Sequence, residues 1–322
     1  MVPGLPPVLV AAAVFLVGVA LVIWSVEVFV ESVAEAALGL GVSGFFLTVL
    51  LAGTDLENAL LGLAAVVGDL PDVALGTVFG EALFVLGMAV GLAGLLVPFE
   101  VTVPRVYQLL TLGSPALLLV LGADGTLTRL DGVVLVAAFL PFVAVVYRLE
   151  SRAGTRFLAA EAVEEATGDE EDESRSGLAA LAVPVLAVAG MTAGSELAVV
   201  GARDLLSAFG IPGLAFGATV MSFVASIEEL FLTVEPVRRG DAHLGVGNVV
   251  GSMAFFMTAN AGVIALVHPI DTGGSVLTVH WPFLLVLLGA VVALFARGRV
   301  TRPTGGLLVA GYVAYWGANY LL

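Results

Sequence analysis

Ten apolar runs, each long enough to cross a lipid bilayer, constrain this chain more than any other feature of its sequence. A helix needs roughly 20 residues to span the hydrocarbon core. With 60% hydrophobic and only 12% charged residues in 322, the chain exceeds the apolar share of soluble domains, which is about 45–50%. We therefore predict an all-α polytopic membrane protein with ten transmembrane helices, near residues 8–35, 43–67, 73–97, 104–122, 131–148, 178–202, 213–237, 244–267, 276–296 and 305–322.

The basic residues predict the orientation of these spans. All 12 are arginine, and only Arg129 and Arg203 lie outside one alternating set of connections. Because basic residues concentrate in cytoplasmic loops, we expect both termini outside and the central linker in the cytoplasm. The net charge of −15 without any lysine indicates the plasma membrane of a salt-loving prokaryote. The other ten arginines are Arg105, Arg148, Arg152, Arg156, Arg175, Arg238, Arg239, Arg297, Arg299 and Arg302.

A long acidic connection, residues 149–176, divides the ten predicted spans into five and five. It contains the stretch "EAVEEATGDEEDES", from Glu161 to Ser174. A block of like charges is typically solvated and lacks a packed core. We expect a flexible linker here, and a regulatory cation-binding segment remains the alternative.

The two halves carry the same polar pattern. An odd number of spans in each half requires the two copies to lie in opposite orientations. We therefore expect two inverted five-helix repeats, residues 1–148 and 177–322, with a substrate site near the midplane of the membrane. A slightly different shift matches Glu27 with Glu196. A shift of 171 residues places Glu57 on Glu228, Asn58 on Glu229, Gly76 on Gly247, Gly80 on Gly251 and Glu81 on Ser252.

Acidic side chains inside apolar spans need partners. A charge at the centre of a bilayer costs about 2.5–3.5 kcal/mol on insertion scales, so these groups should face one another, water or cations. Residues three apart share a helix face, which pairs Asp55 with Asn58 and Ser226 with Glu229. Glu57 and Glu228 point about 100° away from their neighbours, and taken alone they could instead serve as helix-to-helix hydrogen bonds.

Glycines spaced four apart allow two helices to approach closely. Such pairs occur at Gly76 and Gly80 and again at Gly247 and Gly251. Taken alone they are packing features. Next to the acidic helices, however, close approach would bring Glu81, Asn248 and Ser252 toward the intramembrane acids.

At these residues the chain resembles the cation/calcium antiporter superfamily, which contains the sodium/calcium exchangers. That family has two inverted repeats, each with a G-T-S-L-P-E-L motif followed about twenty residues later by G-N-x-x-G-S-N. The first motif is represented by "GTDLENA" from Gly53 and "VASIEEL" from Val224. The second is represented by "GTVFGEA" from Gly76 and "GNVVGSM" from Gly247. The resemblance extends over essentially the whole chain.

The resemblance implies a cation-binding site and also shows where this chain departs from the family. The family's binding glutamate falls on Asn58 and Glu229, and its preceding hydroxyl residue on Asp55 and Ser226. The second-motif serine falls on Glu81 and Ser252. The helix-breaking proline is replaced by Glu57 and Glu228, so we expect backbone carbonyls to be less available as ligands. Amide or acid positions after the second motif hold Val85 and Phe256.

Calcium prefers about six to eight oxygen ligands, with carboxylates prominent among them. Asp55, Glu81 and Glu229 are the predicted metal ligands, with oxygens added by Thr54, Asn58, Ser226 and Ser252. A monovalent cation or a proton must balance the charge when the divalent ion leaves. We therefore expect an antiporter of Ca²⁺ for Na⁺ or H⁺, with inorganic cations and the lipid bilayer as its partners and no cofactor. The alternative is a monovalent cation/proton antiporter on the same fold, and the oligomeric state is left open.

A distant alternative is an intramembrane protease. The sequence "GVSG" around Ser43 imitates the nucleophile motif of rhomboid-type enzymes, with His243, His268 and His280 as candidate bases. All three histidines lie in or beside predicted connections, and the repeat partner "GIPG" lacks the serine. Since no phosphate loop, HExxH motif or basic nucleic-acid patch occurs either, we expect neither an enzyme nor a nucleic-acid-binding protein.

Overall fold

The computed structural model describes residues 6–39, 55–153 and 178–321, and these are almost entirely helical. In the first half the helices are α1 (Pro7–Gly39), α3 (Leu56–Val67), α4 (Pro71–Leu83), the π-helix η1 (Phe84–Ala89), α5 (Val90–Leu96), α6 (Arg105–Leu121) and α7 (Arg129–Ala153). In the second half they are α9 (Leu178–Phe209), α10 (Gly213–Phe216), η2 (Gly217–Met221), α11 (Ser222–Ala225), α12 (Ile227–Arg239), α13 (Ala242–Ala254), η3 (Phe255–Asn260), α14 (Ala261–Val267), η4 (Val276–His280), α15 (Trp281–Arg297) and α16 (Arg302–Leu321).

Each of the ten predicted apolar runs contains helix, although not every helix is long enough to be counted as a span by itself. In the described part of the chain, six segments are long and apolar enough to cross a membrane: Pro7–Val33, Pro71–Leu96, Arg129–Leu149, Val183–Phe209, Ala242–Val267 and Val276–Arg297. A seventh is formed if Gly213–Ala225 and Ile227–Arg239 count as one bent span. The chain is therefore a multi-pass membrane protein. Leu56–Val67 and Arg105–Leu121 are shorter apolar helices.

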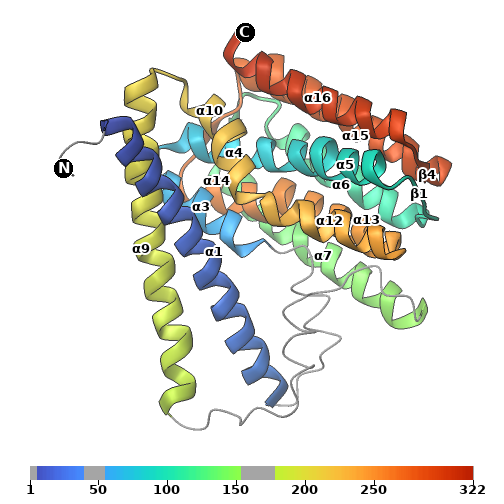
Figure 1. Ribbon diagram of the computed structural model, residues 1–322, viewed down its shortest axis with the longest axis horizontal. Coiled ribbons are helices and arrows are strands. Elements are labelled where there is room, and N and C mark those ends of the chain that lie inside the picture. The colour runs from blue at the N-terminus through green and yellow to red at the C-terminus, as the bar shows by residue number, and fades with distance from the viewer. Residues whose placement is uncertain (1–5, 40–54, 154–177, 322) are drawn as a thin grey trace.

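The two longest helices, α1 and α9, lie side by side and run in opposite directions along one flank of the molecule (Figure 1). Their contact is close because glycines meet at the crossing. A Cβ added to Gly18 would lie 2.3 Å from the backbone nitrogen of Ala198 and 2.7 Å from the carbonyl oxygen of Gly194. Side chains larger than hydrogen would therefore separate the two helices.

The segments that carry the second motif of each half lie at the centre. Burial reaches 94% of the residues in the apolar window of Pro71–Leu96 and 83% in that of Ala242–Val267, against 22% in that of Arg129–Leu149. Such helices, apolar on every side, belong in the core of the bundle. Polar residues on them are consequently shielded from the lipid.

Close packing of α4 against α10 and η2 confirms the role predicted for one glycine pair. A Cβ on Gly76 would lie 2.3 Å from the carbonyl oxygen of Leu214, and one on Gly80 would lie 2.3 Å from Ser222 Oγ. Gly217 lies on η2, on the other side of this seam between α4 and η2. A Cβ added there would lie 2.0 Å from the carbonyl oxygen of Val73. These glycines let the two halves of the chain meet backbone to backbone.

Equivalent elements of the two halves begin and end at equivalent residues. The bounds of α4, η1 and α5 are offset by 171 residues from those of α13, η3 and α14, and the first residues of α3 and α12 show the same offset. Two short antiparallel ribbons also join the halves. Strand β1 (Phe99–Glu100) pairs with β4 (Arg299–Val300), and β2 (Thr126–Leu127) pairs with β3 (Ile270–Asp271).

Candidate cation-binding site

Two helices begin inside the bundle at the first motif of each half. Helix α3 starts directly after Asp55, and α12 starts directly after Ser226, where the axis from α11 bends by 49°. Aspartate and serine are favoured N-cap residues because their oxygens can accept a bond from a free backbone N–H. Neither side chain makes that bond here. Their oxygens therefore remain available for another partner.

The span of the second half is broken at Ser226 although Glu228 stands where the family has its helix-breaking proline. The first turns of α3 and α12 carry Glu57 and Glu228 with Glu229. Acidic residues are favoured there by the partial positive charge of a helix N-terminus, which accounts for glutamates at the break.

Glu229 is the centre of a hydrogen-bonded group between α12 and α13. Ser252 Oγ lies 3.0 and 3.1 Å from its two carboxylate oxygens, and Asn248 Nδ2 donates to Oε2. The Glu229 residue is 2% exposed and Ser252 is fully buried. Two neutral donors thus orient this carboxylate while leaving its charge uncompensated.

Glu81 is the fully buried acid of α4 in the first half, at the position that matches Ser252 under the shift of 171 residues. Its Oε2 accepts a hydrogen bond of 3.1 Å from Asn260 Nδ2 of η3. Asn58 on α3 is also fully buried. Asn260 was not predicted from the sequence, and it brings an amide from the second half to an acid of the first.

The acids of the two halves meet. Asp55 and Glu229 are near enough for their carboxyl groups to interact directly. Glu81 also interacts electrostatically with Glu229. Glu57, which is 9% exposed, interacts electrostatically with Glu228. Carboxylates in such proximity repel one another unless a proton or a cation lies among them. The arrangement therefore favours positively charged occupants.

Several buried oxygen atoms on the segments that carry these acids have no hydrogen-bond partner. Buried polar atoms in folded proteins nearly always have a hydrogen-bond partner. Five buried oxygens on the segments described above have none: Asp55 Oδ2, Asn58 Oδ1, Glu81 Oε1, Ser226 Oγ and Asn260 Oδ1. A bound cation would satisfy such oxygens, whereas packing alone does not.

The predicted site residues are placed as follows. The structure brings together Asp55, Glu57, Glu81, Glu229, Asn248 and Ser252. Asn58 and Ser226 are fully buried on the same segments. Glu228 lies beside them but is exposed, and Thr54 falls outside the described residues. Within the described ranges, no three acidic or histidine side chains form a group that could hold a metal ion by themselves. Neutral oxygens would have to complete the shell around any cation.

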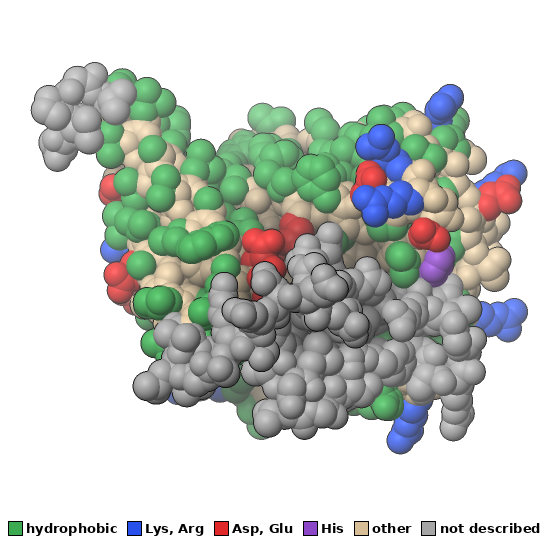
Figure 2. All heavy atoms as spheres, turned by 60° about the horizontal axis from the view of Figure 1, so that its bottom comes forward, with side chains coloured by type: hydrophobic (Ala, Val, Ile, Leu, Met, Phe, Trp, Pro, Cys, Tyr) green, Lys and Arg blue, Asp and Glu red, His purple; other side chains and the backbone are tan. Residues whose placement is uncertain are grey.

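On the surface, Figure 2 shows acidic side chains gathered near the centre of the view, with mainly hydrophobic side chains above them and to their left.

The structure tests only part of the protease alternative. Ser43 lies outside the described residues. Of the candidate bases, His280 is 1% exposed, and its Nδ1 is 2.7 Å from the hydroxyl of Tyr315.

Buried carboxyl groups at helix breaks within a bundle of apolar helices are typical of membrane transporters of cations. Comparison with known proteins identifies the family within this class. The sequence model of the sodium/calcium exchanger protein family matches residues 10–148 and 179–321. The chain belongs to the sodium/calcium exchanger family, and it is a cation antiporter.

Relatives match over nearly their full length. The inner membrane protein YrbG of Escherichia coli K12 is 29% identical, with 98% of each chain covered. The putative antiporter CaxA of Alkalimonas amylolytica is 29% identical over 98% of this chain and 99% of its own. The sodium/calcium exchanger MaX1 of Methanosarcina acetivorans is 23% identical over 94% and 96%.

The fold also has a solved counterpart. The sodium-calcium exchanger NCX_Mj, soaked with 100 mM Na⁺ and 10 mM Sr²⁺, superposes with a TM-score of 0.58 at 22% identity. The match covers 97% of this chain and 99% of that one. It establishes that the two chains share a fold.

Proposed function

We propose that the protein exchanges Ca²⁺ for Na⁺ or H⁺ at a site near the midplane of the membrane, built around Asp55 and Glu229. One observation carries the proposal: five buried oxygens without partners lie on the segments where the acids of the two halves meet. A hard cation that takes six to eight oxygen ligands is the occupant that such a set fits.

Glu229 and Asp55 would supply the charge and their neighbours the remaining ligands. The proposed shell adds Glu81, Asn58 and Ser226 from the predicted set, together with Asn260. Ser252 and Asn248 act by holding the Glu229 carboxylate in place through the hydrogen bonds described above. Thr54 precedes Asp55 directly and stays in the proposed set. Glu57 and Glu228 would attract cations at the edge of the site.

Charge balance would couple the two ion movements. When Ca²⁺ leaves, the carboxylates of Asp55 and Glu229 remain in contact inside the membrane. Two unpaired charges there are unfavourable, so Na⁺ or H⁺ would have to enter before the empty site could turn to the other side. Exchange, rather than uniport, follows from that requirement.

Alternating access would use the two inverted repeats, residues 1–148 and 177–322. The common offset of α4, η1 and α5 from α13, η3 and α14 supports a ten-helix arrangement of two five-helix copies. The crossed pairing of β1 with β4 and β2 with β3 supports a pseudo-twofold relation. We further propose a prokaryotic plasma membrane location, with both termini outside and residues 149–176 as a cytoplasmic linker.

Ion flux in proteoliposomes tests this function. The purified protein would be reconstituted with Ca²⁺ inside, and gradients of Na⁺, K⁺ and pH would be imposed one at a time. We expect Ca²⁺ efflux to be accelerated by an inward gradient of Na⁺ or of H⁺. Exchange of Na⁺ or K⁺ for H⁺ without any Ca²⁺ movement would overturn the proposal and favour the monovalent alternative.

A further inference from the structure

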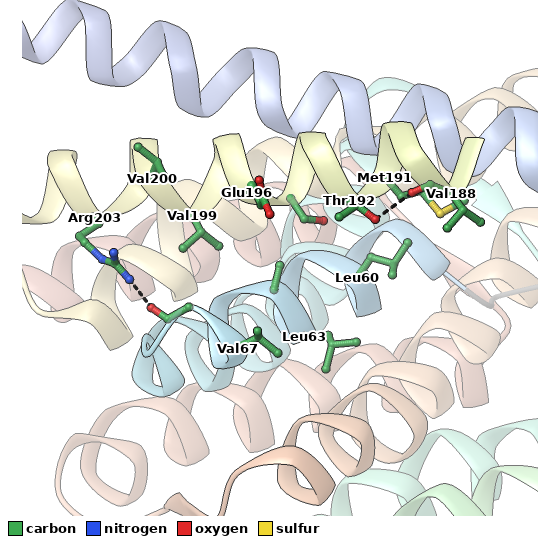
Figure 3. A pocket seen from close by; sticks show the side chains of 13 residues that line it. Leu60, Leu63, Val67, Val188, Met191, Thr192, Glu196, Val199, Val200 and Arg203 are labelled. Carbon is green, nitrogen blue, oxygen red and sulfur yellow. Dashed lines mark hydrogen bonds between the residues drawn. The ribbon is translucent and has the colours of Figure 1, made fainter. Parts of the chain in front are cut away.

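A cavity of about 520 Å³ lies between α3 and α9, on the flank of the molecule (Figure 3). Its walls are mainly apolar, formed by residues such as Leu60, Leu63, Val67, Val188, Met191 and Val199. The volume lies within the range of about 300–1,000 Å³ typical of small-molecule sites. We refer to this cavity as the α3–α9 groove.

One carboxylate lines this apolar groove. Glu196 sits within the membrane-crossing segment Val183–Phe209 and is exposed. Among the described residues it makes no hydrogen bond or ion pair, in contrast to the acids of the central site. An ionisable side chain inside a membrane span is costly unless it has a partner. The groove therefore presents a negative charge without a counter-charge, in apolar surroundings.

The only arginine of the groove lies at one end of it. The Arg203 guanidinium donates a hydrogen bond to the backbone carbonyl of Gly68, at the end of α3 (Figure 3). Arg203 is two helical turns away from Glu196 along α9. Its charge disfavours a second cation at that end. The apolar part of a ligand bound through Glu196 would thus extend the other way, along Met191, Val188 and Leu60.

We propose that the α3–α9 groove binds an amphipathic monocation, such as a long-chain alkylammonium ion, with the ammonium group at Glu196 and the hydrocarbon chain along the apolar wall. Charge complementarity selects this occupant over a neutral chain. The groove is separate from the Asp55–Glu229 site, so the proposal does not depend on which ions the protein exchanges.

The chain contains no cysteine, so a single introduced thiol can report on the groove. Thr192, which lines it, would be changed to cysteine and labelled with an environment-sensitive fluorophore. In nanodiscs of zwitterionic lipid, decyltrimethylammonium would be titrated alongside decanol and decyl sulfate. We expect saturable binding of the cation and no comparable response to the neutral or anionic analogue.

Glu196→Gln in the Thr192→Cys background should weaken decyltrimethylammonium binding about two- to fivefold, the effect of losing an exposed ion pair. Glu27→Gln is the matched control, since Glu27 is the exposed acid at the corresponding place on α1 and does not line the groove. It should leave the affinity unchanged. Ala64→Trp, which fills the groove without changing its charge, should abolish binding.

Equal affinity in Glu196→Gln and its parent would overturn the proposal, as would decanol binding as tightly as the cation. Either result would mean that the apolar wall holds the ligand and that the charge of Glu196 does not select it. Binding that survives Ala64→Trp in a protein with normal thermal stability would place the cation elsewhere and overturn it as well.

Discussion

Glu229 depends on two donors from a neighbouring helix, and this makes Ser252 a sensitive position. Ser252→Ala removes the hydroxyl that lies 3.0 and 3.1 Å from the carboxylate oxygens. Hydrogen bonds to charged groups contribute about 1.5–3 kcal/mol, so we expect the KM for Ca²⁺ to rise by roughly tenfold or more. Flux assays at graded Ca²⁺ concentrations would measure it.

Ser32→Ala is the control for Ser252→Ala. The Ser32 hydroxyl donates only to the carbonyl of Val28 within its own helix, at 2.7 Å. Its loss should leave the KM unchanged. If Ser252→Ala and Ser32→Ala behaved alike, the hydrogen bonds to Glu229 would have no part in holding the cation.

Removing the charge of Asp55 should reduce transport without reducing stability. Asp55→Asn keeps the size of the side chain and removes a negative charge that faces Glu229. We expect Ca²⁺ flux to fall by at least about tenfold, while the melting temperature of the apo protein stays the same or rises, because like-charge repulsion is relieved. The exposed Asp72→Asn should change neither. A joint loss of flux and stability in Asp55→Asn would point to a structural role.

The sequence could predict the acids of this site but not all of its neutral partners. Asp55, Glu81 and Glu229 stand out because charges in apolar spans require a reason. Asn260 was missed since it lies beyond both motifs and its counterpart at the 171-residue shift is Ala89. An amide within a run of apolar residues was the one available signal. Its contact with Glu81 spans 179 residues of sequence, which no local pattern indicates.

At the scale of helices, hydropathy predicts where a span lies but not where it breaks. The predicted run 213–237 is mainly apolar up to Ser226, and its hydropathy gives no sign of a bend. The structure bends there by 49°. A helix start formed by Ser226, followed by two glutamates, is compatible with the break, but the hydrophobic period alone does not locate it.

The seam between α4 and η2 should tolerate no added side chain. In Gly217→Ala the new Cβ would lie 2.0 Å from the carbonyl oxygen of Val73 and 2.8 Å from its carbonyl carbon. Both atoms are backbone and cannot move aside. Because overpacking of this kind costs about 1–3 kcal/mol, we expect a lower melting temperature in detergent, together with reduced flux as α4 and Glu81 are displaced.

Gly113→Ala provides the comparison for that seam. Gly113 lies within α6 and has no atom within 4 Å of an added Cβ. Alanine is also the better helix former, so this variant should melt at the same temperature as the parent or higher. Equal destabilisation by the two substitutions would show that the close approach of α4 and η2 is not what makes Gly217 necessary.

At the scale of the whole molecule, composition and hydropathy predicted the membrane class, and the repeat predicted which segments correspond. The pairing of short strands between the two halves could not be predicted from the sequence. Strands β1 to β4 have two residues each, too short for an alternating pattern to register. The packing of α1 along α9 was likewise not foreseen, since it depends on glycines such as Gly18 and Gly194 meeting at one crossing.

The acidic linker should be dispensable for exchange. Residues 161–174 lie outside both proposed repeats and outside the parts of the chain that the exchanger family matches. Their deletion is expected to leave Ca²⁺ flux within about twofold of the parent, because a block of like charges is not expected from its sequence to add to a packed core. Complete loss of flux in a deletion that retains normal thermal stability would place a functional element in the linker.

The most direct test of the central claim is Ca²⁺ flux in proteoliposomes that contain Glu229→Gln, measured beside Glu235→Gln. Both variants lie on α12 and exchange a carboxylate for an amide, but the side chain of Glu235 is 41% exposed and paired with Arg238 and Arg239. We predict that Glu229→Gln abolishes ion-driven Ca²⁺ exchange while Glu235→Gln retains it. Exchange of normal size in Glu229→Gln would contradict the proposed site.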